Sequence, residues 1–409
     1  MRRVVITGMS NITSLGESWD EIGPALHAGK AGIRYMPEWD GMEDLNARLG
    51  GPMDWFKHEK VYPRQQSRSM GRVATMLVYC SERALEQAGL REDTAVLTSG
   101  RTGVAVGSSF GSTEPIKSFV NFMDTGKSSG LNATSYIRMM SHTGPVNIAV
   151  FFGLQGRVIT TSSACTSASQ GIGYAYENIR SGAQDVMLAG GSDEFCVTMT
   201  MVFDRLYATS RRHDDPQHAV RPMDAARDGL VIGEASGILV LEELEHALAR
   251  GATPLAEVVG FATNCDGTHI SRPNRDTQEI VMRQAMKDAR MSASDLSFVS
   301  AHSTGTVAGD MEESHASEAV YGQSVPLHSL KGNFGHTLGG CAAIEISLGI
   351  EMLKEGRISP TANLTEVDPN CAELDYVMGE SRVVTSNAFA SNNFAFGGVN
   401  TSLVIRNYD

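Results

Sequence analysis

The setting of Cys165 points to thiol chemistry. It lies in the segment 160–168 (TTSSACTSA), where an apolar stretch ends, small residues form a turn and a helical pattern begins. A thiol at a helix start faces the positive end of the helix dipole and unpaired backbone N–H groups, which lower its pKa. Cys165 is therefore a candidate nucleophile. The alternative is a buried core cysteine, which describes Cys341, at the start of another helical pattern, equally well.

Two histidines occupy loops suited to acid–base or oxyanion chemistry. His302 follows the apolar stretch 298–301, and His336 precedes the helical pattern 342–354. A helix N-terminus disfavours imidazolium, and a neutral imidazole can donate a hydrogen bond to a developing oxyanion. The alternative for each is a buried, satisfied side chain. Lys331 and Glu345 could set the electrostatics of such a site or form a structural ion pair.

The segment 391–400 (SNNFAFGGVN) is a Gly-rich turn between two apolar stretches. Its backbone amides could help bind an oxyanion, and Phe394 and Phe396 could line an apolar tunnel beside Gly397 and Gly398. The alternative is a plain hairpin whose aromatic rings belong to the core.

Alternating strands and helices must position these residues, and this alternation is typical of an α/β protein with buried sheets. The expected strands cover 3–7, 102–107, 157–162, 186–189, 236–241, 257–260, 298–301, 383–387 and 402–405. The expected helices cover 73–88, 166–180, 242–250, 277–289 and 342–354. The segments 31–66 and 204–228 fit neither pattern, and we expect long surface excursions there.

A boundary near 250–254 predicts two units, residues 1–253 with the cysteine and residues 254–409 with the two histidines. Both begin with a short apolar strand, which is weak evidence of duplication. The chain of 409 residues carries 34 Lys and Arg against 47 Asp and Glu, a net charge of −13. This acidity disfavours nucleic-acid and anionic-membrane binding.

Six cysteines without a C-x-x-C pair disfavour a disulfide framework and favour a reducing compartment. The chain has no apolar run of membrane-spanning length and no signal-peptide pattern at its start. We therefore expect a cytoplasmic protein.

Seven segments together resemble the β-ketoacyl-[acyl-carrier-protein] synthases of the decarboxylating type, in the thiolase-like superfamily, with the elongating synthases I and II as nearest kin. The resemblance spans nearly the whole chain. The segments are 4–8 (VVITG), 163–165 (SAC), 221–229 (RPMDAARDG), 240–247 (VLEELEHA), 302–310 (HSTGTVAGD), 331–336 (KGNFGH) and 394–398 (FAFGG). It implies a five-layered α/β/α/β/α fold of two similar halves.

The resemblance implies that Cys165 carries an acyl group as a thioester. His302 and His336 would stabilise the thioester carbonyl of malonyl-acyl carrier protein while CO₂ leaves, and the resulting carbanion would attack the acyl group. Lys331 and Glu345 match the family's supporting lysine and glutamate.

The same resemblance implies the groups that bind substrate. The backbone N–H groups of Cys165 and Phe396 would form the oxyanion hole, and Phe396 would gate the acyl pocket. Thr304 and Thr306 would bind the phosphopantetheine arm, which arrives on the acyl carrier protein. No organic cofactor and no metal are implied, and a homodimer is expected.

Some positions depart from the family pattern. Ser303 replaces a glycine, and Phe110 stands where the family usually has a smaller side chain deep in the acyl pocket. A bulky ring there would shorten or reshape the tunnel, which favours short, unsaturated or aryl-primed acyl groups of a polyene or other specialised pathway. The alternative is that Phe110 packs sideways into the core.

An acidic enzyme that binds an acidic carrier protein needs local positive charge. Arg64, Arg68 and Arg72 are spaced by four and are expected to share one helix face. Arg211 and Arg212 lie in the second excursion. We expect these five arginines to dock the carrier protein; a solvated surface without a partner is the alternative.

Three other readings compete with this one. A thiolase would carry a second cysteine where this chain has Phe394 to Phe396, and an initiating synthase would carry Asn in place of His336. A non-catalytic chain-length-factor scaffold would lack the nucleophile. The active subunit of a heterodimer with such a partner remains compatible with the sequence.

Overall fold

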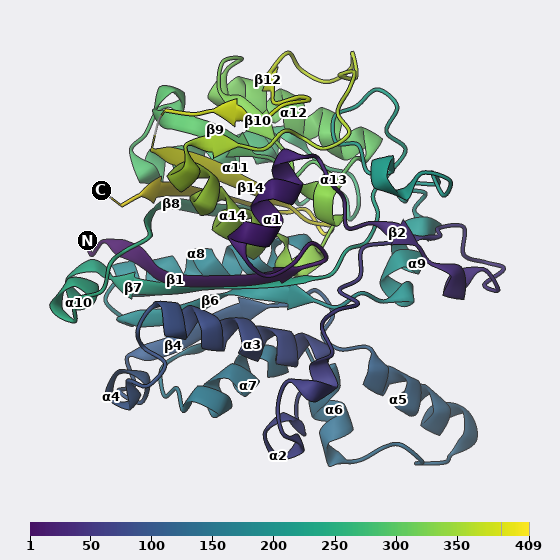
Figure 1. Ribbon diagram of the computed structural model, residues 1–409, viewed down its shortest axis with the longest axis vertical. Coiled ribbons are helices and arrows are strands. Elements are labelled where there is room, and N and C mark those ends of the chain that lie inside the picture. The colour runs from purple at the N-terminus through teal and green to yellow at the C-terminus, as the bar shows by residue number, and fades with distance from the viewer. Residues whose placement is uncertain (386, 409) are drawn as a thin grey trace.

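The computed structural model describes residues 1–385 and 387–408 and forms five layers, three of helices and two of strands (Figure 1). Helices α8 and α14 lie between the two layers of strands, which explains why their apolar side chains are almost fully buried. The outer helices cover the remaining faces. The layers comprise α3 (Arg72–Gln87) and α7 (Thr143–Phe152) on one side, α8 (Ser167–Arg180) and α14 (Cys341–Glu355) in the middle, and α11 (Arg275–Ala289) and α12 (Val307–Tyr321) on the other side.

Two sets of five strands repeat the same order and directions. The first set has the order β5-β4-β6-β7-β1 and the second β10-β9-β14-β15-β8. In each set the first three strands are parallel, and the last two pair antiparallel. The fold therefore consists of two similar halves. The strands are β1 (Val4–Thr13), β4 (Thr102–Gly107), β5 (Val158–Thr161), β6 (Val186–Asp193), β7 (Ala235–Glu243), β8 (Ala256–Cys265), β9 (Leu296–Ser300), β10 (Pro326–His328), β14 (Ala388–Phe394) and β15 (Val399–Asn407).

A short pairing joins the halves. Val4, Val5 and Ile6 of β1 pair antiparallel with β8, which makes one continuous sheet of eleven strands with β12 at its far edge. The predicted boundary at residue 253 lies between α10 and β8. The two termini lie close together in Figure 1, and the Arg3 guanidinium lies 5.6 Å from the ring centroid of Tyr408.

The remaining elements are short or peripheral, and α5 and α6 project from the body of the molecule in Figure 1. The other helices are α1 (Trp19–His27), α2 (Arg64–Ser67), α4 (Thr94–Leu97), α5 (Glu114–Thr125), α6 (Ala133–Met139), α9 (Val197–Arg205), α10 (Leu244–Ala249) and α13 (Lys331–Phe334). The other strands are β2 (Arg34–Tyr35), β3 (Leu49–Gly50), β11 (Arg357–Ile358), β12 (Asp375–Tyr376) and β13 (Arg382–Val383).

The strand expected at 383–387 is the clearest error of the sequence prediction. The long strand in this region is β14, which begins at residue 388, and residue 386 lies outside the described residues. The polar run 391–393 suggests a turn, but Asn392 and Asn393 are fully buried, where Asn392 accepts a hydrogen bond from Tyr321 and Asn393 donates one to Glu345. The segment 204–228, expected at the surface, also contains buried residues such as Asp224 and Arg227.

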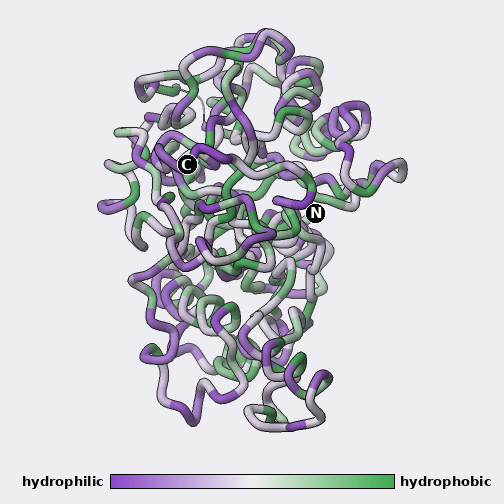
Figure 2. The backbone as a smooth tube through the Cα atoms, turned by 90° about the vertical axis from the view of Figure 1, so that its right-hand side faces the viewer, coloured by the Kyte–Doolittle hydropathy of each residue, from purple (hydrophilic) through white to green (hydrophobic). Residues whose placement is uncertain are grey.

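No helix among the described residues is long and apolar enough to cross a membrane. Figure 2 shows hydrophobic segments concentrated in the interior and hydrophilic segments in the outer loops. The buried apolar side chains form a large cluster around α8 and α14 and a second cluster between α3 and the first set of strands.

Candidate active site

Cys165 sits at the end of a strongly bent connection between β5 and α8. Its segment, residues 164–166, forms a single 3-10 turn, and Ala164 has a left-handed backbone with φ of 50°. The Ser167 hydroxyl braces the turn, since it donates to the Ala164 carbonyl and accepts from the Ser163 N–H. These contacts place the Cys165 sulfur in a buried position facing the other half of the molecule.

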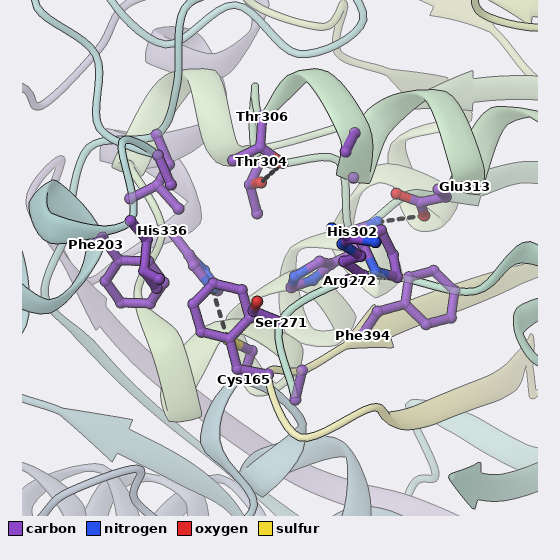
Figure 3. Close-up of a pocket in the computed structure, with 18 of the residues that line it drawn as sticks. Cys165, Phe203, Ser271, Arg272, His302, Thr304, Thr306, Glu313, His336 and Phe394 are labelled. Atoms are coloured by element: carbon purple, nitrogen blue, oxygen red, sulfur yellow. Dashed lines mark hydrogen bonds between the residues drawn. The ribbon is translucent and has the colours of Figure 1, made fainter. Parts of the chain in front are cut away.

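The second half brings two imidazoles to this sulfur. The Nε2 atom of His336 lies 2.8 Å from the Sγ atom of Cys165, as the dashed line in Figure 3 shows. The ring of His302 packs edge-on against that of His336, with centroids 5.1 Å apart. One ring nitrogen of each histidine and the sulfur all lie within 4.8 Å of one another. The three groups could therefore act on one substrate atom, and their donor types would also suit a thiophilic metal ion.

Burial makes the resting site electrically neutral. Burial raises the pKa of the Cys165 thiol to about 12, although Lys331 and the backbone N–H groups of Cys165 and Phe396 lower it. The expectation of a lowered thiol pKa is therefore wrong for this closed site. Burial, with a smaller effect of Lys331, holds the pKa of both His302 and His336 well below 6.5. Both imidazoles are uncharged at neutral pH.

The surroundings leave the tautomers of the two histidines open. The Nδ1 atoms of His302 and His336 are buried and have no hydrogen-bond partner within residues 1–385 and 387–408. Each Nε2 can therefore carry or accept a proton without breaking a contact on the opposite side of the ring.

Lys331 and Glu345 form a fully buried ion pair behind the reacting groups. The second carboxylate oxygen of Glu345 accepts a hydrogen bond of 2.9 Å from the Asn393 side chain. Burial lowers the pKa of Lys331, but Glu345, Cys341 and Glu313 together raise it by more, so the ammonium stays charged. Cys341 is buried nearby and contacts the Cys165 carbonyl oxygen at 3.3 Å.

Glu313 is a positioning residue that the sequence analysis missed. Its carboxylate accepts the backbone N–H groups of His302 and Ser303, at 2.7 and 2.6 Å, and the Ser303 hydroxyl at 2.8 Å. It thus fixes the loop that presents His302, and Ser303 adds a contact that a glycine could not make. Burial raises the pKa of Glu313 to about 7. The only sequence signal was an acid one helical turn after Asp310.

A cavity of about 330 Å³ leads from the surface to Cys165. The hydroxyls of Thr304 and Thr306 line it and lie 3.1 Å apart. Phe394 packs 6.0 Å from His302, and Phe396 stacks on Phe203 at 5.1 Å. Figure 3 shows Thr304, Thr306, Phe394 and Phe203 around the sulfur.

The Gly-rich turn 394–398 closes one side of this cavity. Gly397 and Gly398 both have positive φ, 91° and 73°. A Cβ on Gly398 would lie 2.8 Å from the Cβ of Asp266, so a side chain there would also meet steric strain.

Phe110 does not occupy the cavity that reaches Cys165. It is 43% exposed and lines a second, open cavity of about 320 Å³ together with Ile116, Met139, Met140, Ser141 and His142. The expected position deep in a pocket is therefore not seen in the single chain, and neither is sideways packing into the core.

The expected docking face of Arg64, Arg68 and Arg72 is wrong as a single helix face. Arg64 belongs to α2, and α3 starts only at Arg72. Arg72 forms a partly buried ion pair with Glu234 and also donates to the carbonyls of Met53 and Phe56, which explains its absence from the surface. It is a structural residue.

The other four candidate arginines are exposed or partly exposed to solvent. Arg64, Arg68 and Arg211 are exposed. Arg212 is half-buried, donates to the Ala226 carbonyl and lies 3.8 Å from Asp228. Asp228 lines the active-site cavity, so Arg211 and Arg212 lie near its entrance.

The duplicated fold, with a cysteine from one half facing two histidines from the other, defines a condensing enzyme of the thiolase-like fold. Comparison with known proteins agrees. The family model "Beta-ketoacyl synthase, N-terminal domain" matches residues 1–247, and "Beta-ketoacyl synthase, C-terminal domain" matches residues 255–365. The chain therefore belongs to the β-ketoacyl synthase family.

Individual relatives match the chain over its full length. A "3-oxoacyl-[acyl-carrier-protein] synthase 2" from Synechocystis sp. is 33% identical, covering 100% of this chain and 98% of the relative. A crystal structure of a β-ketoacyl synthase from Burkholderia phymatum is 50% identical with a TM-score of 0.97, covering all of both chains. The ishigamide ketosynthase/chain length factor is 32% identical with a TM-score of 0.91, again covering all of both chains.

Proposed function

We propose that this protein catalyses the decarboxylative Claisen condensation of a Cys165-bound acyl group with malonyl-acyl carrier protein, which gives a β-ketoacyl-acyl carrier protein. The observation that carries this proposal is the 2.8 Å contact between Cys165 Sγ and His336 Nε2, with the ring of His302 beside it. Similarity to the 3-oxoacyl-[acyl-carrier-protein] synthase 2 from Synechocystis sp. supports a carrier-bound substrate.

In the first half-reaction, Cys165 attacks the thioester carbonyl of an acyl-carrier protein. The bond between Sγ and the acyl carbon forms, the bond between the acyl carbon and the carrier sulfur breaks, and the thiol proton of Cys165 goes to the departing carrier thiolate. Because thiol and imidazole are both neutral at rest, this proton moves only when a substrate is present. The backbone N–H groups of Cys165 and Phe396 point at the sulfur and stabilise the adjacent oxyanion.

In the second half-reaction, malonyl-carrier protein enters the vacated cavity. Its carboxylate leaves as CO₂, and the electron pair of the broken C–C bond forms an enolate at the thioester. His302 and His336, each with Nε2–H, donate hydrogen bonds to the enolate oxygen. The carbanion attacks the acyl carbon and expels Cys165 as a thiolate, which takes up one proton from solvent water. Thr304 and Thr306 bind the phosphopantetheine arm. The buried ion pair of Lys331 and Glu345 supports the reacting groups from behind.

This reaction involves no change of oxidation state and takes its one net proton from solvent, so we propose that the cysteine and the two imidazoles carry it without an organic cofactor or a metal ion. We place it in the cytoplasm, because all six cysteines are free thiols and suit a reducing compartment. The product chemistry fits fatty-acid or specialised polyene and polyketide synthesis.

We also propose a homodimer. The edge strand β5 and the neighbouring α7 carry exposed apolar side chains, including Val146, Val150 and Val158. Such an edge is commonly covered in a stable protein. Similarity to the ishigamide ketosynthase/chain length factor makes a heterodimer with a related subunit the second candidate.

The test combines product mass and intact-protein mass. Wild-type protein is incubated with malonyl-carrier protein and a panel of acyl- and aryl-carrier proteins. We expect a stoichiometric acyl adduct, absent in Cys165→Ala, and a condensed product. His302→Ala should retain the adduct and lose condensation at least about 100-fold. An adduct on Cys165→Ala, or full condensation by His302→Ala, would contradict the proposal.

A further inference from the structure

One charged side chain in the active-site cavity has no partner in the protein. Three carboxylates line this cavity, those of Asp228, Asp266 and Glu313, and each accepts hydrogen bonds from backbone or side-chain groups. Arg272 also lines the cavity, is exposed, and its guanidinium forms no ion pair or hydrogen bond with the part of the chain that the structure describes. Among the described residues, the cavity therefore presents one positively charged side chain, Arg272, without a hydrogen-bond or ion-pair partner.

The backbone that carries Arg272 is held in place. The His269 ring nitrogen Nδ1 accepts the N–H groups of Ser271 and Arg272, at 3.1 and 3.2 Å. The carbonyl of Ile270 accepts the Gly397 N–H at 2.7 Å, which ties this loop to the Gly-rich turn beside Cys165. Arg272 is thus presented from a braced loop, as a recognition group requires.

The position of Arg272 along the cavity indicates what it binds. Cys165 lies buried at the inner end, and Thr304 and Thr306 line the cavity farther out. Ile270, two residues before Arg272, is 74% exposed, which places this loop at the outer rim. A substrate arm whose thioester lies at Cys165 therefore carries its far end past Arg272.

We propose that Arg272 binds the phosphate of the phosphopantetheine arm, an inference that rests on the proposed function. A guanidinium matches a phosphate in charge and in its two parallel hydrogen bonds. The malonyl carboxylate is the poorer candidate, because an ion pair to it would stabilise the ground state and would be lost as CO₂ leaves. The phosphate keeps its charge throughout the reaction.

The experiment measures protection of Cys165 from iodoacetamide, which needs the cavity but no turnover. Increasing concentrations of 4′-phosphopantetheine or of pantetheine, which lacks the phosphate, are added, and the alkylation rate is followed by intact mass. In wild-type protein we expect half-protection at a five- to tenfold lower concentration of the phosphorylated compound, as for an exposed charge-assisted contact. Arg272→Gln should lose this preference.

Arg275→Gln is the matched control, because Arg275 is an exposed arginine three residues away that does not line the cavity. It should keep the wild-type preference. Equal protection by the two compounds in wild-type protein, or an unchanged preference in Arg272→Gln, would overturn the proposal. A protein that shows the preference yet forms no condensed product would instead refute the proposed function and leave this inference standing.

Discussion

At the scale of single residues, the site works with uncharged groups that share protons. Cys165, His302 and His336 are all buried, and burial disfavours thiolate and imidazolium alike. Behind them, the charges of Lys331 and Glu345 form a buried ion pair and offset each other. A neutral imidazole can donate to an enolate oxygen, which an enzyme that creates negative charge by losing CO₂ requires.

The depressed histidine pKa values predict a loss of stability in acid. Below about pH 6.5 the unfolded chain protonates each histidine while the folded chain does not, so the free energy of unfolding falls as pH falls. At pH 5.5 the loss should reach about 1.4 kcal/mol for each histidine. Denaturant unfolding at pH 7.5 and 5.5 should therefore show a smaller pH effect in His302→Asn than in wild-type protein. An identical pH effect would contradict the shifted pKa.

Replacement of Glu313 should separate the two half-reactions. In Glu313→Gln the amide N–H₂ faces a backbone N–H donor, so the loop of His302 shifts. Malonyl decarboxylation should fall roughly 10- to 100-fold, while Cys165 acylation changes less than about threefold. The control is Glu312→Gln, half-buried on the same helix, which should match wild-type protein. Equal losses in both half-reactions would argue for a general folding defect.

At the scale of elements, the sequence predicted the parts with strong local patterns. Helices α3, α8 and α14 and strand β4 match their expected bounds within about two residues, because apolar spacing and glycine stops determine them locally. Strand β14 was misplaced, since its asparagines are buried only through partners distant in sequence.

The residues of the candidate site also fall into two groups: those that a local sequence motif marks, and those that only the folded structure brings into place. Cys165, His302 and His336 stand in recognisable motifs, and the structure brings them together. Glu313 contacts the His302 loop and Arg272 lines the cavity only because the fold brings distant segments together, so the sequence analysis did not select them. Arg72 shares a spacing of four with Arg68, but its ion pair with Glu234, 162 residues away, decides its environment.

Arg72 should therefore contribute to the stability of the folded protein, measured as the free energy of unfolding. Arg72→Met would leave the buried Glu234 carboxylate without its cation and remove contacts to two backbone carbonyls. We expect a loss of about 3 kcal/mol in unfolding free energy. Arg68→Met, at an exposed position, should change it by less than about 0.5 kcal/mol. Comparable stability of the two variants in thermal and denaturant unfolding would refute this assignment.

At the scale of the whole molecule, an acidic enzyme must attract an acidic partner. Arg68 remains a candidate for this contact, so Arg68→Glu should raise the KM for carrier protein about fivefold at low salt. The difference should shrink at 0.5 M salt, because screening weakens exposed charge pairs. Steady-state kinetics at the two salt concentrations decide the matter, and a KM unaffected at low salt would count against docking at Arg68.

Two variants, one test and one control, examine the proposed homodimer. Val150→Asp places a charge on the exposed apolar surface of α7, and Val383→Asp places one on a similarly exposed valine, 74% accessible, in β13. Light scattering after size exclusion should show a monomer or a severalfold weaker dimer for the first and an unchanged dimer for the second. A wild-type monomer would favour the heterodimer, and a fully dimeric Val150→Asp would place the interface elsewhere.

Strand β15, the last of the described strands along the chain, lies between β8 and β14 in the middle of its sheet. Until residues 399–407 leave the ribosome, the half that bears both histidines lacks its central hydrogen-bonding ladder. We therefore expect a chain truncated before residue 399 to leave His302 and His336 without the sheet that holds them against Cys165.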